Sequence, residues 1–170
     1  MAMTIPRLTR RDFSIGGASV FPVLTAASAK GDWDAGISQK AEAIHQLVTF
    51  KGNPKQVYEI LLDAERFSRM TGGMGTEISR DVGGTFSLFN GQIKGRHLDL
   101  VPGELIVQAW RSESWKPHQY SIARFELSAD GSGARLAFDH TGFPAGQAEH
   151  LAAGWRDHYW VPLEKYLRAG

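Results

Sequence analysis

Histidine and tyrosine are the side chains of this sequence best suited to proton transfer. Histidine exchanges its proton near neutral pH, which suits a general acid or base. His140 precedes a Thr-Gly-Phe-Pro segment, and His158 is followed directly by Tyr159. These three residues are the candidate catalytic groups, with either histidine as the base and Tyr159 as its acid–base partner. The alternative is that each histidine is only hydrogen-bonded in place.

The spacing of the histidines does not favour a metal centre. The six histidines stand at positions 45, 97, 118, 140, 150 and 158, and no two are four residues apart, the helical spacing that lets two imidazoles share one ion. His150 and His158 would be separated by roughly 12 Å along a helix. The chain has no cysteine, no Gly-x-Ser-x-Gly elbow, and no phosphate-binding or dinucleotide-binding glycine motif. We therefore expect neither a metal nor a cofactor.

A second group of side chains is suited to binding. Bulky aromatic rings that carry one polar atom fit ring-shaped ligands. The candidate ligand-binding residues, drawn from the predicted sheet and the last predicted helix, are Phe86, Leu88, Trp110, Trp115, His140, Trp155 and Tyr159. The alternative is that these residues only fill a hydrophobic core.

The charge balance argues against a nucleic-acid partner. Lys and Arg number 19 against 18 Asp and Glu, which gives a net charge of +1. Arg7, Arg10 and Arg11 lie in the first 29 residues, so the rest of the chain is close to neutral. Nucleic-acid binding needs a basic surface, and this composition does not supply one.

Residues 1–29 have the order of an export signal. Arg10 and Arg11, followed by Asp and then Phe13, resemble a twin-arginine box, although Ser replaces the leucine usual after Phe13. A Gly-, Ala- and Val-rich stretch follows, too short and too weakly apolar for stable membrane insertion. Ala27 and Ala29 then supply the small residues of a cleavage site.

This signal predicts a periplasmic or secreted protein that uses the twin-arginine translocase. Residues 30–40 are polar and read as a flexible lead-in to a domain over 41–168. The alternative is an N-terminal arm on a cytoplasmic protein.

The start of the domain has clear element boundaries. Apolar residues alternate up to position 50 and predict a strand with one buried face. Asn53 is a helix N-cap and Pro54 suits the first helical turn. A second short helix carries Phe67 and Met70.

Residues 76–142 change to a period of two and predict a meander of about five or six strands. Turns are expected at Asn90-Gly91, 101–104 and 130–133. In this pattern Phe86 and Leu88 alternate with Ser87 and Phe89.

The last helix has one apolar stripe, formed by Leu151, Trp155, Tyr159, Leu163 and Tyr166. Gly154 suggests a close approach to a neighbour, because glycine costs ~1 kcal/mol against alanine in a helix. Pro162 predicts a kink.

This order of elements defines an α+β class in which a curved antiparallel sheet surrounds a long C-terminal helix. A curved sheet and a straight helix leave a gap between them, which predicts a cavity.

Several motifs of the domain resemble one family. The segments 82–91, 102–111, 140–144 and 154–160 occur in the order found in the activator of heat-shock protein 90 ATPase homologue family. The resemblance covers about 41–168 and implies the helix-grip, START-like (birch-allergen-like) fold. Relatives in that superfamily bind lipids, sterols, hormones and polyketides, and some act on them. The separate chaperone-binding domain of eukaryotic members is not recognisable here.

The sequence thus leads to three hypotheses. We favour a periplasmic carrier of a small hydrophobic molecule over an enzyme. The first alternative is a cofactor-free lyase, cyclase or hydrolase acting on an apolar ring compound. The second is a co-chaperone-like interaction module that uses the outer face of the sheet.

The export signal yields a direct prediction. Changing Arg10 and Arg11 together to lysine should stop export of a fused reporter, because the translocase requires the arginine pair. Reporter activity in the periplasmic fraction measures this. Export that survives the double change would contradict a twin-arginine route.

Overall fold

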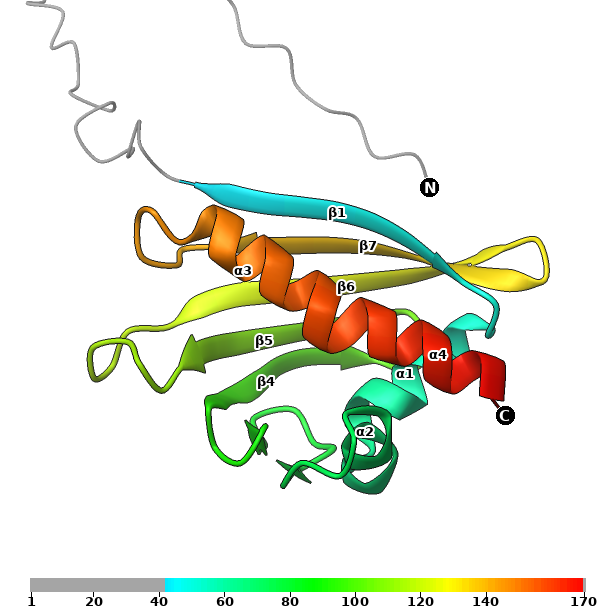
Figure 1. The fold of residues 1–170 in the computed structure, drawn as a ribbon, viewed down its shortest axis with the longest axis horizontal. Helices are drawn as coiled ribbons and strands as arrows, with labels where there is room; N and C mark the ends of the chain where they lie inside the picture. The colour runs from blue at the N-terminus through cyan, green and yellow to red at the C-terminus, as the bar shows by residue number, and fades with distance from the viewer. Residues whose placement is uncertain (1–41, 170) are drawn as a thin grey trace, which may run out of the picture. The chain divides into compact units, whose positions relative to one another are not determined.

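A seven-stranded antiparallel sheet curves around one long helix in the computed structural model, which describes residues 42–169 (Figure 1). The elements are β1 (Ala43–Phe50), α1 (Pro54–Leu62), α2 (Ala64–Met70), β2 (Glu77–Ile78), β3 (Thr85–Leu88), β4 (Ile93–Val101), β5 (Leu105–Ser112), β6 (Ser121–Asp130), β7 (Gly133–Thr141), α3 (Ala148–Trp155), η2 (Arg156–Trp160) and α4 (Val161–Ala169). The predicted export signal and lead-in lie outside the described residues. No helix within 42–169 is long and apolar enough to cross a membrane.

The sheet confirms the predicted meander. Its order is β1-β7-β6-β5-β4-β3-β2, so β2 to β7 follow one another and β1 returns to the open side of β7. β1 pairs with β7 over its whole length, from Ala43 opposite Thr141 to Phe50 opposite Ala134. The predicted fold class, a curved antiparallel sheet around a long C-terminal helix, is confirmed.

The first helix starts where the sequence predicts it. The Asn53 side chain accepts from the Gln56 backbone N–H at 2.9 Å, and the Gln56 side chain accepts from the Asn53 N–H at 3.0 Å. This reciprocal pair satisfies two donors that have no helical acceptor, and Pro54 has no N–H to satisfy. The predicted α2 is also present, with Phe67 and Met70 buried.

The long C-terminal helix contains a widened turn. Leu151, Trp155, Tyr159 and Leu163 are buried as the stripe predicts, but Trp160 is buried too. The reason is η2, a π-helical turn in which the Val161 N–H bonds back to the Arg156 carbonyl. The extra residue in that turn brings two neighbouring side chains to the same face. The turn lies directly before Pro162, and the helix continues past the proline (Figure 1).

The prediction of a close approach at Gly154 is wrong. A Cβ atom built there meets no neighbour within 4 Å, so the position borders open space. The absence of a side chain at Gly154 in α3 therefore leaves open space beside the helix. A larger side chain at this position would fill that space.

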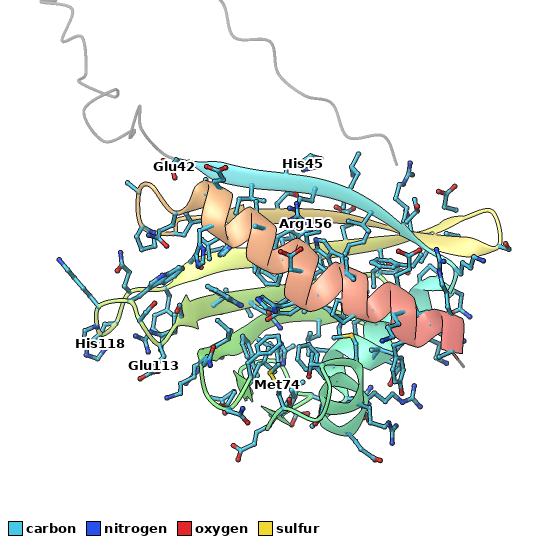
Figure 2. All side chains as sticks on the ribbon, in the orientation of Figure 1. Glu42, His45, Met74, Glu113, His118 and Arg156 are labelled. Carbon is cyan, nitrogen blue, oxygen red and sulfur yellow. The ribbon has the colours of Figure 1, made fainter. Side chains whose placement is uncertain are left out.

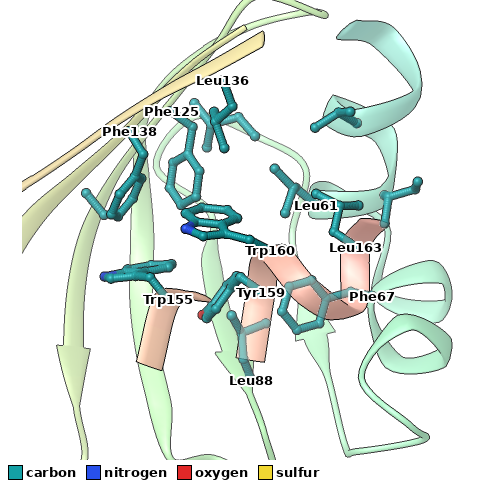
Figure 3. Packing of buried hydrophobic residues seen from close by; sticks show 14 of the residues in the cluster. Leu61, Phe67, Leu88, Phe125, Leu136, Phe138, Trp155, Tyr159, Trp160 and Leu163 are labelled. Atoms are coloured by element: carbon teal, nitrogen blue, oxygen red, sulfur yellow. The ribbon is translucent and has the colours of Figure 1, made fainter. Parts of the chain in front are cut away.

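Most of the space between sheet and helix is filled by aromatic rings (Figure 3). Trp155 packs against Phe138 of β7 with ring centroids 4.4 Å apart, and it stacks on Trp160 at 5.7 Å with 17° between the planes. Phe125 of β6 closes the group at 5.6 Å from Trp155. The predicted cavity therefore does not run along the whole helix but is confined to one end.

Two glycines offer a matched test of packing. A Cβ at Gly95 in β4 would lie 2.1 Å from the Ala109 carbonyl oxygen and 2.3 Å from the Phe86 ring. We expect Gly95→Ala to lower the free energy of unfolding by about 1–3 kcal/mol through overpacking. Gly154→Ala should raise it by about 1 kcal/mol through helix propensity. Urea denaturation measures both, and equal effects of the two changes would refute this packing account.

Candidate functional site

A pocket of about 400 Å³ lies between the α3–η2 helix and the β4–β5 side of the sheet. Its lining residues come from strands, helix and four loops: Met74, Phe89, Gln92, Ile93, Trp110, Ser112, Ser114, Trp115, Gln147, His150, Leu151, Gly154, Trp155, His158 and Tyr159. Met74 is labelled in Figure 2, below the helix. Both the sheet and the helix thus contribute walls, as expected for a site enclosed by a curved sheet.

Four of the seven predicted ligand-binding residues line this pocket. Trp110 and Trp115 form one wall, with ring centroids 5.3 Å apart and 65° between the planes. Trp155 and Tyr159 of the helix form the other, 4.3 Å apart. Trp155 also meets Trp110 at 5.5 Å, so the two walls touch at the inner end.

The other three predicted residues lie outside the lining. Phe86 packs on His97 at 5.3 Å, further along β3 and β4. Leu88 is buried in the core beside Tyr159 (Figure 3). His140 lies behind Trp155, fully buried. The alternation along the strands could not separate these three residues from the four that line the pocket. It predicts on which face of the sheet a side chain lies, but not whether that side chain reaches the pocket.

His140 is the centre of a hydrogen-bonded chain between helix and sheet. The Trp155 indole N–H donates to His140 Nδ1 at 3.0 Å. Because an indole N–H can only donate, the imidazole proton lies on Nε2, which donates to Ser121 Oγ at 2.7 Å. Ser121 in turn donates to the Trp110 carbonyl at 2.9 Å. Both ring nitrogens are engaged, so this histidine is arranged to position Trp155.

The chemistry of His140 follows from its burial. Burial lowers the pKa of His140 to about 4, since the charged imidazolium is disfavoured away from water. The neutral ring is also the form that the Trp155 hydrogen bond requires.

Tyr159 and His158 are neighbours in η2 with opposite surroundings. Burial raises the pKa of Tyr159 well above its ordinary value, and the nearby Trp110 indole offsets part of that rise. His158 is exposed at the pocket rim, with its ring 6.1 Å from Phe89. Within residues 42–169 no hydrogen bond joins His140, His158 and Tyr159. The structure therefore does not assemble the three candidates into an acid–base set.

Phe89 is a pocket residue that the strand alternation missed. β3 ends at Leu88, and Phe89 has a left-handed φ of 53°, which takes its ring out of the alternating pattern. The ring packs against Tyr159 at 5.4 Å and Phe67 at 5.6 Å. The Asn90-Gly91 turn signal was the indication that the strand would end here.

The described residues hold no cluster of three or more His, Asp or Glu side chains that could bind a metal ion. The polar lining atoms come from serine, glutamine and exposed histidine side chains at the rim. The arrangement can enclose an apolar ring system and offer hydrogen bonds near its edges.

The fold and pocket together define a helix-grip domain with a side-chain-lined pocket between helix and sheet. The sequence profile of "Activator of Hsp90 ATPase homolog 1-like protein" matches residues 51–168, and the chain belongs to that family.

Related proteins agree with this assignment. Human activator of 90 kDa heat shock protein ATPase homolog 1 is 28% identical over 122 residues, which cover 72% of this chain and 36% of the human protein. The chain thus spans about a third of the length of the curated relatives it matches. An HSP90 activator from Plasmodium falciparum has a similar structure, with a TM-score of 0.70, 25% identity and coverage of 74% of this chain and 96% of that one. CalU16 from Micromonospora echinospora shares the fold, with a TM-score of 0.64, 20% identity and coverage of 75% and 76%.

The lowered pKa of His140 predicts acid sensitivity. Between pH 6.5 and about 4 the unfolded chain binds a proton at this residue that the folded chain rejects, so stability falls as the pH falls. The loss from this residue should reach about 3 kcal/mol near pH 4.

His140→Gln removes this titration while His97, whose pKa burial also lowers, stays in both proteins. We expect the variant to be less stable than the wild type at pH 7 and the difference to shrink towards pH 4. Denaturant titrations at several pH values measure it. A difference that stays constant with pH would show that His140 titrates alike in folded and unfolded chains.

Proposed function

We propose that this protein binds and carries a small apolar ring compound in the pocket between the sheet and the C-terminal helix. The observation that supports this proposal is the pocket of about 400 Å³ walled by Trp110, Trp115, Trp155 and Tyr159. A volume at the lower end of the usual range for ligand sites suits a compact molecule. Rings at several inclinations offer both faces and edges to a planar guest.

The proposed entrance to the pocket lies along the helix. Gly154 lies between His150 and His158 at four-residue intervals, and all three line the pocket. The two histidines are exposed, while the missing side chain between them leaves open space. A ligand that enters here passes a polar rim before it reaches the aromatic walls.

The place of action is part of the proposal. The twin-arginine signal read from residues 1–29 supports export to the periplasm, by a route that carries folded proteins. A domain that has folded in the cytoplasm could also take its ligand there and carry it out. The carrier then has the translocase as a transient partner and the small molecule as its cargo.

An enzymatic role has less support, because His140 is committed to Trp155 and Ser121 and does not line the pocket. His158 and Tyr159 do line the pocket. An enzyme of this fold would therefore use these two residues, and not His140, as its acid–base groups.

A chaperone-directed role is the second candidate, and it rests on the names of the curated relatives. The outer face of the sheet carries polar pairs, His45 with Asp139 and Arg124 with Glu126. Among the exposed apolar residues of the described part, Leu47 lies in β1, Ile122 in β6 and Val82 in the loop between β2 and β3. Stimulation of a chaperone ATPase by the domain would favour this candidate over the carrier.

The carrier proposal is tested by filling the pocket from Gly154. Fluorene, an uncharged tricyclic hydrocarbon, serves as the probe, and tryptophan fluorescence reports binding. We expect saturable binding to the wild type and to Gly154→Ala, and at least about tenfold weaker binding to Gly154→Phe, because the added ring takes the ligand's space. Wild-type fluorescence that responds neither to fluorene nor to its carbonyl analogue fluorenone, or equal affinity of all three proteins, would refute the carrier proposal.

A further inference from the structure

The pocket wall is uncharged. Among its lining residues within 42–169 there is no Lys, Arg, Asp or Glu. The guanidinium of Arg111 in β5 bonds to Glu113 at 3.3 Å and donates to the Trp115 carbonyl at 2.9 Å, and its Nε has no partner in the described residues. A charged ligand buried here would lose its hydration without gaining a counter-ion, which is strongly unfavourable.

Two buried donors at the pocket have no partner in the described part of the chain. They are the Tyr159 hydroxyl and the Trp110 indole N–H, on side chains that are 5% and 3% exposed. The hydroxyl and the indole are close enough for Trp110 to affect the pKa of Tyr159, yet they do not meet the geometry of a hydrogen bond. A buried donor without a partner is unfavourable in a closed core, because it has lost its hydrogen bonds to water.

Two other buried indoles, those of Trp155 and Trp160, do have acceptors. The Trp155 N–H donates to His140 and the Trp160 N–H donates to the Gln46 side chain at 2.6 Å. The Trp110 N–H has no such acceptor, although its ring contacts that of Trp155. Among the buried polar atoms without a partner in the described residues, the Tyr159 hydroxyl and the Trp110 N–H belong to pocket-lining side chains, whereas those of His97 do not.

We infer that the ligand is an uncharged planar ring system with a carbonyl-type oxygen, which accepts hydrogen bonds from Tyr159 and Trp110 at the inner end of the pocket. This inference rests on the proposed carrier function and names the class of ligand. The aromatic walls recognise the ring faces, and the paired donors recognise the oxygen. A hydrocarbon of the same shape fills the walls but leaves both donors unpartnered.

Trp115 packs edge-on against Trp110 from the loop between β5 and β6. Its N–H donates to the Ser112 carbonyl at 3.1 Å and its carbonyl accepts from Arg111, so its backbone is held in place. A ligand that reaches the Trp110 N–H would need side chains such as Trp115 to rotate, and rotamer changes of this kind are common on binding.

The test compares fluorenone with fluorene, two tricyclic probes that differ in a carbonyl group. We expect the wild type to bind fluorenone about tenfold more tightly than fluorene, and Tyr159→Phe to lose most of this preference while its affinity for fluorene is kept. Tyr166→Phe, a tyrosine of α4 outside the pocket lining, is the matched control and should keep the preference. A fluorenone carboxylate should bind more weakly than fluorenone.

The infrared carbonyl stretch of bound fluorenone gives a second readout. It should move to lower wavenumber in the wild type and less so in Tyr159→Phe or, if that variant does not fold, in Trp110→Phe. Equal affinity for both probes, or tighter binding of the carboxylate, overturns the inference but leaves the carrier function standing. Binding of neither probe overturns both. The melting temperature of Tyr159→Phe should be no lower than that of the wild type. A large loss of stability would mean that the hydroxyl stabilises the fold and does not wait for a ligand.

Discussion

The hydrogen-bonded chain from Trp155 through His140 and Ser121 to the Trp110 carbonyl fixes how the helix meets the sheet. It joins α3 to β7, β6 and β5 within a fully buried region, where an unsatisfied polar atom would be costly. Every donor in it has one acceptor, so the Trp155 ring has a single orientation. The pocket exists beside this ring because Trp155 is prevented from turning into the open space next to it.

The same interaction separates the filled part of the interior from the empty part. On one side of Trp155, the rings of Phe125, Phe138 and Trp160 pack with centroids 4.4 to 5.7 Å from its own. On the other side Gly154 contributes no side chain, and the pocket lies between the helix and the indoles of Trp110 and Trp115. The π turn at η2 adds to this division, since it brings Trp160 into the core and Tyr159 to the pocket from adjacent positions. The aromatic core thus fills one part of the space between helix and sheet, and the pocket occupies the other part.

Much of this arrangement could be predicted from local patterns. Alternation in β1, the Asn53 cap, the turn signals and the helical stripe each depend on neighbours in sequence, and each is confirmed. The residues that line the pocket could not be predicted from local patterns in the same way. Phe89 enters it through a left-handed backbone angle, and Gly154 opens it where a close contact was expected. His140 lies behind its wall because its partners are far away in the sequence. These features depend on tertiary packing, which no period of two or four residues encodes.

The indole N–H resonances of the tryptophans test the central claim most directly. In a nitrogen-15 spectrum titrated with fluorenone, the signals of Trp110 and Trp115 should shift saturably with one common dissociation constant. The signal of Trp160, whose N–H is bonded to Gln46 outside the pocket, should stay in place. Unchanged signals for Trp110 and Trp115, or a shift of Trp160 as large as theirs, would contradict a binding site between the helix and the sheet.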